Sequence, residues 1–307
     1  WGHPGVVVTN NDPADFADLE DFFDVILTDV PCSGEGMFRK DPVAVSEWSP
    51  ENVEICWQRQ RRIISDIWPS LKSGGLLIYS TCTYNTQEDE ENIRWMRDEF
   101  GAEILPVDAP TAWNITGNLL AGEDFPVYRF LPHRTKGEGF FLAVLRKPEE
   151  GSLQTGYKST SAQGKKKMAS SVSKEQLAVA RGWLLSPDDY ELSVNGTNIT
   201  AFPKEYLPEL SSLQQSLRVI QAGVALAEMK GKDLIPNHAL AMSQILRDDT
   251  FPHEEVSYEQ AIAYLRKEAI VLSAEAPRGY VLLTYNYIPL GFVKNIGNRA
   301  NNLYPQE

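Results

Sequence analysis

Four short apolar runs in the first half of the chain predict buried β-strands. They cover residues 5–9, 23–28, 76–80 and 140–145, and each is a nearly continuous series of aliphatic or aromatic side chains. Runs of this kind are typical of strands that are covered on both faces, as in parallel sheets. The pattern therefore predicts a sheet at the centre of this half of the chain.

Two helices are predicted between these strands. Residues 49–71 begin with Ser-Pro-Glu, which supplies an oxygen cap, a proline for the first turn and an acid, and they end just before a glycine pair. Thr86 and Asp89 have the spacing of a capping box and predict a second helix that ends near Gly101. Because strands alternate with helices, we expect a mainly parallel α/β sheet.

A polar stretch separates the two halves of the chain. Residues 149–176 are rich in Gly, Ser, Thr and Lys and poor in large apolar side chains, which predicts a flexible linker. Its run of lysines at 165–167 has two interpretations, a solvated charge cluster or a contact with an RNA backbone. The sequence leaves both open.

The second half predicts a smaller α+β region. Residues 213–228 and 258–267 have helical spacing, and residues 279–285 and 288–294 read as two strands of a small β unit. With 307 residues, the chain is long enough for two domains, each with its own core. We expect a first domain over residues 1–148 and a second over 177–307.

The net charge of −13 lies entirely in the first half of the chain. Residues 1–150 carry 13 Lys and Arg against 26 Asp and Glu, whereas residues 151–307 carry 16 of each kind. An acidic surface repels phosphate, so any contact with a nucleic acid has to be local.

Composition also indicates the cellular compartment of the protein. No apolar run approaches the about 18 residues of a membrane helix, so no membrane partner is expected. Three cysteines are too few for a disulfide framework and fit a reducing cytosol, which predicts a cytoplasmic protein. The chain begins at Trp1 rather than Met, which suggests a longer parent polypeptide.

Two of the three cysteines occupy equivalent positions. Cys32 and Cys82 each lie just past the carboxyl end of a predicted strand, where ligands of open α/β sheets bind, and adjacent parallel strands would place them side by side. Cys56 lies inside a predicted helix and reads as a small buried hydrophobe. Two cysteines and four scattered histidines give no metal-ligand spacing. A transient disulfide is possible, and otherwise thiol chemistry with the nearby Asp29 remains.

The residues around these cysteines resemble the paired motifs of the RNA cytosine-C5 methyltransferases of the Nol/Nop/Sun family. The paired motifs are TDVPCSGEG at 28–36 and STCT at 80–83. Intermediate matches over residues 6–147 are RKDP at 39–42, WSP at 48–50, QRQ at 58–60, KSGG at 72–75 and EGFF at 138–141. The resemblance implies a partial Rossmann-like methyltransferase sheet followed by a smaller α+β PUA-like region.

The resemblance assigns a role to each motif residue. It implies that Cys82 adds to carbon 6 of cytosine, that Cys32 serves product release and that Asp29 lies against the base or the reacting thiol. It also implies S-adenosylmethionine as cofactor, with Asp29 and Asp12 beside it. For Asp12, the alternative is a turn former before Pro13.

Two features of the family's cofactor site are not found in the sequence. The family holds S-adenosylmethionine through a glycine-rich loop after its first strand and an acidic residue after its second, and neither precedes residue 11. We therefore expect the residues of this chain, taken alone, to bind the cofactor poorly.

The end of the chain resembles the PUA-like domain that follows the catalytic domain in bacterial members of the family. The resemblance lies in residues 279–305, and residues 217–230 also fit; the match is weaker than that of the cysteine motifs. It implies a second RNA contact, for which Lys294 and Arg299 are candidates, although exposed loop residues without a partner are the favoured interpretation.

Four residues of the first half have two interpretations. Arg39 and Lys40 could meet RNA phosphates near the target base or form a plain surface pair. Trp48 and Trp57 could stack on bases, but core packing is the favoured interpretation.

The leading hypothesis is an S-adenosylmethionine-dependent RNA cytosine-C5 methyltransferase that acts on small-subunit ribosomal RNA. The alternative is a non-catalytic RNA-binding protein that retains the methyltransferase fold. The presence of both Cys32 and Cys82 separates the two, because RNA binding alone requires neither thiol. A thiol-disulfide redox protein is disfavoured, because the sequence has no Cys-x-x-Cys motif.

Overall fold

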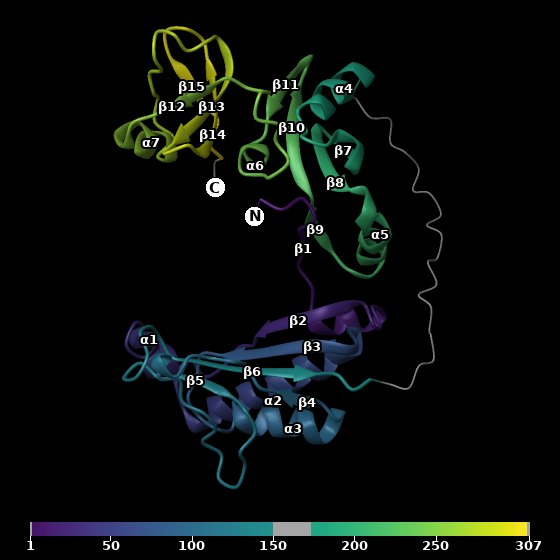
Figure 1. Ribbon diagram of the computed structural model, residues 1–307, viewed down its shortest axis with the longest axis vertical. Coiled ribbons are helices and arrows are strands. Elements are labelled where there is room, and N and C mark those ends of the chain that lie inside the picture. The colour runs from purple at the N-terminus through teal and green to yellow at the C-terminus, as the bar shows by residue number, and fades with distance from the viewer. Residues whose placement is uncertain (1, 150–172, 306–307) are drawn as a thin grey trace. The chain divides into compact units, whose positions relative to one another are not determined.

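The computed structural model describes residues 2–149 and 173–305 (Figure 1). It contains two compact units, one of residues Asn11–Lys158 and one that joins Trp1–Asn10 to Ser159–Glu307. We call them the cysteine unit and the C-terminal unit and describe each by itself. Most of the predicted linker, including the lysines at 165–167, lies outside the described residues.

The cysteine unit is built on a five-stranded sheet. Its strands are β2 (Phe23–Asp29), β3 (Leu71–Thr81), β6 (Phe140–Arg146) and β4 (Glu103–Leu105), in that spatial order, with β5 (Tyr128–Phe130) also paired to β6. β2 and β3 are parallel, but β6 is antiparallel to β3, β4 and β5. The expectation of a mainly parallel sheet is therefore wrong. A parallel β6 would need a crossover helix, and the segment between β4 and β6 contains only β5 and a single 3-10 turn, η4 (Thr111–Trp113).

The helix α2 (Pro50–Ile67) begins as the sequence predicts. The side chain of Ser49 accepts a hydrogen bond from the backbone N–H of Asn52, and Pro50 occupies the first turn. The helix ends at Ile67 rather than at residue 71, because a short 3-10 turn, η3 (Trp68–Ser70), leads directly into β3. Pro69 within that turn has no N–H to continue the helical hydrogen bonds.

The helix α3 (Glu90–Phe100) ends as predicted at Gly101, which adopts the left-handed conformation. Its predicted capping box is wrong. The side chain of Asp89 makes no cap hydrogen bond and instead accepts a hydrogen bond of 2.7 Å from the hydroxyl of Thr81 on β3. Asp89 is fully buried, so it fastens the helix start to the sheet. The remaining helical segments of this unit are η1 (Pro13–Asp18), η2 (Glu35–Met37) and α1 (Pro42–Glu47).

The core of the cysteine unit lies between the sheet and the helices α2 and α3, which run along the same face of the sheet (Figure 1). Ile64 and Ile93 contribute from the helices, and Leu77 and Tyr79 from β3. β2 forms one end of the sheet, and its side chains Val25 and Leu27 are 52% and 68% exposed. The expectation that this strand is covered on both faces is thus wrong among the described residues.

The C-terminal unit contains two four-stranded sheets and several short helices. One sheet has the order β11 (Asp233–Pro236), β10 (Val224–Lys230), β8 (Asn198–Pro203) and β7 (Tyr190–Asn195). The other has the order β12 (His253–Glu255), β13 (Gly279–Tyr285), β14 (Ile288–Asn295) and β15 (Ala300–Asn302). The helices are α4 (Lys174–Gly182), α5 (Leu207–Ser216), α6 (His238–Ala241) and α7 (Tyr258–Leu265), with 3-10 turns η5 (Pro187–Asp189) and η6 (Lys204–Tyr206).

Three of the four elements that the sequence predicts here are confirmed. The helix α7 and the strands β13 and β14 lie close to their predicted bounds. The predicted helix over residues 213–228 is wrong, because α5 ends at Ser216 and the chain continues as β9 (Val219–Ala222) and β10. Gly223 joins these strands at φ 73°, and a Cβ there would lie 2.1 Å from the carbonyl oxygen of Ala201. A left-handed glycine at this close approach interrupts any helix.

The first predicted strand exists as β1 (Val7–Thr9), but its partner is β9 of the C-terminal unit, to which it is antiparallel. Val8 is 39% exposed, so the prediction of a buried strand is wrong. Residues 1–10 thus pack with the C-terminal unit, whereas the sequence analysis placed them with the first domain.

We expect Arg129→Ala to lower the free energy of unfolding of the cysteine unit by about 3–5 kcal/mol. Arg129 is fully buried, its guanidinium binds both oxygens of Glu90, and it lies 3.1 Å from the carboxylate of Asp89. Its removal leaves two buried carboxylates without their cation. Denaturant unfolding measures the loss, and Arg146→Ala is the control because Arg146 forms an exposed pair with Glu103. Equal losses in both variants would contradict this account.

Candidate active site

The strands β2 and β3 place the two cysteine loops side by side at one edge of the sheet. They are parallel, and Asp29 at the end of β2 lies opposite Ser80 near the end of β3. The chain then turns out of the sheet at both positions, and the Sγ atoms of Cys32 and Cys82 lie 3.1 Å apart. The prediction that adjacent parallel strands bring the two thiols side by side is confirmed. Both side chains are half-buried.

This contact makes the two thiols unequal. The hydrogen bond that Cys32 donates lowers the pKa of Cys82 to about 7. The same hydrogen bond, together with burial, raises the pKa of Cys32 well above its usual range. The negative charge of Asp29 acts on Cys82 in the opposite direction and raises its pKa, but the hydrogen bond is the larger effect. Near neutral pH a large fraction of Cys82 is therefore thiolate, while Cys32 keeps its proton.

Backbone contacts hold the Cys32 loop against the Cys82 loop. The N–H of Gly36 donates a hydrogen bond of 2.8 Å to the carbonyl oxygen of Cys82. A Cβ on Gly36 would lie 2.7 Å from that oxygen and 2.7 Å from the carbonyl oxygen of Gly139. This close approach of three backbone segments explains why the motif has glycine here.

The carboxylate of Glu35 links the same two loops through side-chain contacts. Its Oε2 accepts hydrogen bonds from the N–H of Tyr84 at 2.7 Å and from the hydroxyl of Thr83 at 2.9 Å. Its Oε1 accepts a hydrogen bond of 3.0 Å from the indole of Trp48. Trp48 is 37% exposed, so its predicted core packing is wrong. The sequence analysis missed Glu35, although an acid inside a glycine-rich loop was a usable signal.

A second carboxylate, Glu88, is fully buried behind the cysteines. It accepts hydrogen bonds from the N–H of Ser33 at 3.0 Å, from the amide of Asn85 at 2.8 Å and from the amide of Gln60 at 2.7 Å. The sequence analysis missed Glu88 as well, because an acid in a polar stretch gives no sign of burial.

The two predicted cofactor residues differ in their surroundings. Asp29 is exposed at the carboxyl end of β2, and its charge acts on Cys82. Asp12 caps the turn η1 through the N–H of Ala14, which also lowers the pKa of Asp12, and it forms an ion pair of 3.2 Å with Arg62. The turn-former interpretation of Asp12 describes these contacts.

The four predicted RNA contacts are divided between the units. Arg39 donates a hydrogen bond of 2.7 Å to the carbonyl oxygen of Gly137, and Lys40 beside it is exposed. In the C-terminal unit, Lys294 lies 3.7 Å from Asp233 and over the ring of Tyr280, while Arg299 is exposed between β14 and β15.

Other predicted residues keep structural roles. Cys56 is buried on α2, as expected, and burial raises its pKa. Trp57 is partly buried and stacks under the guanidinium of Arg61 at 4.1 Å. Over the described ranges 2–149 and 173–305, no group of three or more potential metal ligands occurs. Within the same residues, every helix is too short or too polar to span a membrane.

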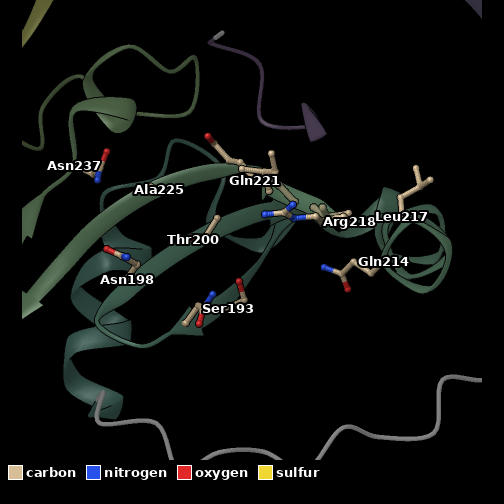
Figure 2. Close-up of a pocket in the computed structure, with 13 residues that line it drawn as sticks. Ser193, Asn198, Thr200, Gln214, Leu217, Arg218, Gln221, Ala225 and Asn237 are labelled. Carbon is tan, nitrogen blue, oxygen red and sulfur yellow. The ribbon is translucent and has the colours of Figure 1, made fainter. Parts of the chain in front are cut away.

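A separate polar cavity of about 640 Å³ lies in the C-terminal unit (Figure 2). Ser193 of β7, Asn198 and Thr200 of β8 and Gln214 of α5 contribute uncharged polar groups, and Arg218 contributes a cation. None of the lining residues is acidic. The cavity offers hydrogen bonds but no group that resembles the thiol site.

Comparison with known families defines the class of the protein. Residues 3–146 match the family described as 16S rRNA methyltransferase RsmB/F, and residues 251–307 match the one described as methyltransferase RsmF PUA domain. The chain therefore combines a methyltransferase domain with a PUA domain. The particular family that residues 3–146 match is RsmB/F, and the C-terminal match is to the PUA domain of RsmF. The family resemblance carried by the two motifs is confirmed.

Curated relatives support the same family. The chain is 34% identical over 302 residues to "Ribosomal RNA small subunit methyltransferase F" of Salmonella agona and 33% identical over 307 residues to the protein of that name from Salmonella paratyphi A. Each match covers 95% of this chain and 60% of the relative, so the chain spans about three fifths of the length of these proteins.

Among solved structures, the chain is similar to NSun6 from Pyrococcus horikoshii with SFG. The identity is 32%, the match covers 41% of this chain and 30% of that one, and the TM-score is 0.34.

We expect Gly36→Ala to destabilise the cysteine unit by about 1–3 kcal/mol, because two carbonyl oxygens occupy the space that the new methyl group needs. Backbone atoms cannot move aside as a side chain can. Gly117→Ala is the matched control, since a Cβ there meets nothing within 4 Å. Denaturant unfolding compares the two variants, and a harmless Gly36→Ala would show that the loops are not in close contact.

Proposed function

We propose that the protein transfers a methyl group from S-adenosylmethionine to carbon 5 of a cytosine in small-subunit ribosomal RNA. The observation that carries the proposal is the pair of thiols 3.1 Å apart, of which Cys82 has a pKa lowered to about 7. The RsmB/F family match and the names of the relatives support the substrate class.

The acidified thiol is the feature that the reaction requires. Carbon 5 of cytosine is a poor nucleophile until a thiolate adds to carbon 6, and this addition converts the ring to an enamine. Cys82 is suited to the addition because it ionises near neutral pH. The electron pair of its thiolate forms the S–C6 bond, and the ring electrons shift toward carbon 5.

Cys32 is suited to the release step. Its pKa is raised mainly by its hydrogen bond to Cys82, and that contact weakens once the Cys82 sulfur is bonded to carbon 6. Cys32 then ionises more readily by losing its proton to water, and its thiolate can accept the proton from the methylated carbon 5. As this proton leaves, the C5–C6 double bond forms again and the Cys82 thiolate is expelled.

The residues present fit the cofactor only in part. Asp29 is exposed at the carboxyl end of β2, where ligands of α/β sheets bind, and its negative charge complements a sulfonium. The carboxylate of Asp12 already pairs with Arg62 and with the N–H of Ala14. When bound, S-adenosylmethionine supplies the electrophilic methyl group. The residues of this chain hold the cytosine and activate it for methyl transfer.

We also propose that both units contact RNA. Arg39 and Lys40 follow the Cys32 loop, and Lys294 and Arg299 belong to the PUA domain. Guanidinium and ammonium groups at such positions fix an RNA backbone without reading its sequence. Because the chain carries a net charge of −13, these contacts have to be local and sensitive to salt.

The proposal predicts a covalent protein–RNA adduct in the Cys32→Ala variant, because the base that completes release is then missing. The chain is incubated with small-subunit ribosomal RNA, with and without S-adenosylmethionine, and run on a denaturing gel. The adduct should accumulate only with S-adenosylmethionine, because Cys32 acts after methyl transfer and an unmethylated adduct reverses without its help.

Cys32→Ala/Cys82→Ala should form no adduct, and Cys32→Ala/Cys56→Ala is the matched control that should retain it. An adduct that survives the loss of Cys82 would contradict the assignment of the nucleophile. If no variant forms an adduct at saturating S-adenosylmethionine while the chain still binds the RNA, the result favours an RNA-binding protein without catalysis.

A further inference from the structure

The carboxylate of Glu88 is buried between the two cysteine loops, and its hydrogen bonds reach both. On one side it accepts from the N–H of Ser33, the residue after Cys32. On the other side it accepts from the amide of Asn85, three residues after Cys82. One carboxylate therefore fixes the distance between the backbones that carry the two thiols.

A neighbouring side-chain amide also fixes the backbone next to Cys32. Gln60 on α2 donates to Glu88 at 2.7 Å and to the carbonyl oxygen of Pro31 at 3.0 Å. Pro31 and Ser33 flank Cys32, so the backbone on both sides of this thiol is attached to Glu88, directly or through Gln60. Ser33 and Thr83 add a contact of 3.1 Å between their hydroxyls, which joins the loops a second time.

The chemistry of this site calls for a carboxylate. Three N–H donors converge on the two oxygens of Glu88, and a carboxylate accepts at both oxygens without presenting a donor of its own. An amide in its place would direct its own N–H groups at one or more of these donors. A buried charge that accepts three hydrogen bonds is stabilised in place and rigidifies its surroundings.

We propose that Glu88 is a positioning residue that holds Cys32 within hydrogen-bond distance of Cys82. The role rests on the proposed function of the two thiols as the catalytic pair. Glu88 acts on Cys82 only through the geometry of the loops and through its charge.

These two effects have opposite signs, which makes the proposal testable. The negative charge of Glu88 raises the pKa of Cys82, whereas the Cys32 hydrogen bond that Glu88 maintains lowers it. Burial and the charge of Asp29 also raise the pKa of Cys82, and a hydrogen bond to the backbone lowers it; Tyr84 lies close by, and the charge of Cys82 raises the pKa of its phenol. The Cys32 hydrogen bond is the largest of these influences. Replacement of Glu88 should therefore raise the pKa of Cys82, because losing the Cys32 hydrogen bond raises this pKa more than losing the charge of Glu88 lowers it.

The test is the pH dependence of alkylation of Cys82 by iodoacetamide, followed by mass spectrometry of the modified peptide. In Glu88→Gln, we expect the midpoint to move upward by about one pH unit, toward an ordinary thiol. Glu99→Gln, the same change on the exposed face of α3, should leave the midpoint unmoved. An unmoved midpoint in Glu88→Gln, or a downward shift, would overturn the proposal, since a downward shift means that only the charge matters.

A second variant covers the case in which Glu88→Gln does not fold. Asn85→Ala removes one donor at the partly exposed end of the site and leaves the carboxylate in place. It should shift the midpoint in the same direction by a smaller amount, and no shift would overturn the proposal. Alkylation requires neither RNA nor cofactor, so a negative result here is distinct from a failure of the proposed methyl transfer.

Discussion

The contact between the Sγ atoms of Cys32 and Cys82 is the constraint on which the rest of the site depends. It exists because two parallel strands end level with each other, so that the loops after them emerge at the same edge of the sheet. The Sγ atoms lie 3.1 Å apart, and the hydrogen bond from Cys32 lowers the pKa of Cys82 to about 7. One thiol is thereby ready to attack, and the other holds the proton.

Loops are ordinarily mobile, so a contact this close between two of them needs support. The structure supplies that support with two carboxylates, Glu35 on the open side of the site and Glu88 on the buried side, and with the close backbone approach at Gly36. Behind them, the buried ion pairs of Arg129 tie the start of α3 to the sheet. The two thiols at the surface are thus held in contact by a network of hydrogen bonds and ion pairs beneath them.

The sequence predicts the position of the thiols better than it predicts what holds them. Apolar runs and helix signals locate β2, β3 and α2, and parallel pairing follows from the helix between the strands. The antiparallel direction of β6 could not be read in this way, since an apolar run has no direction. Glu88 was missed because a buried acid is recognisable only once its donors are placed around it in three dimensions.

The central claim is that Cys32 activates Cys82, and the pH dependence of Cys82 alkylation in the unmodified chain and in Cys32→Ala tests it most directly. In the unmodified chain, the account predicts a midpoint near 7, since the thiolate accepts a hydrogen bond from its neighbour. Cys32→Ala should move the midpoint up to the range of an ordinary thiol. The same midpoint in both proteins would contradict the account, because the pKa of Cys82 would then be independent of Cys32.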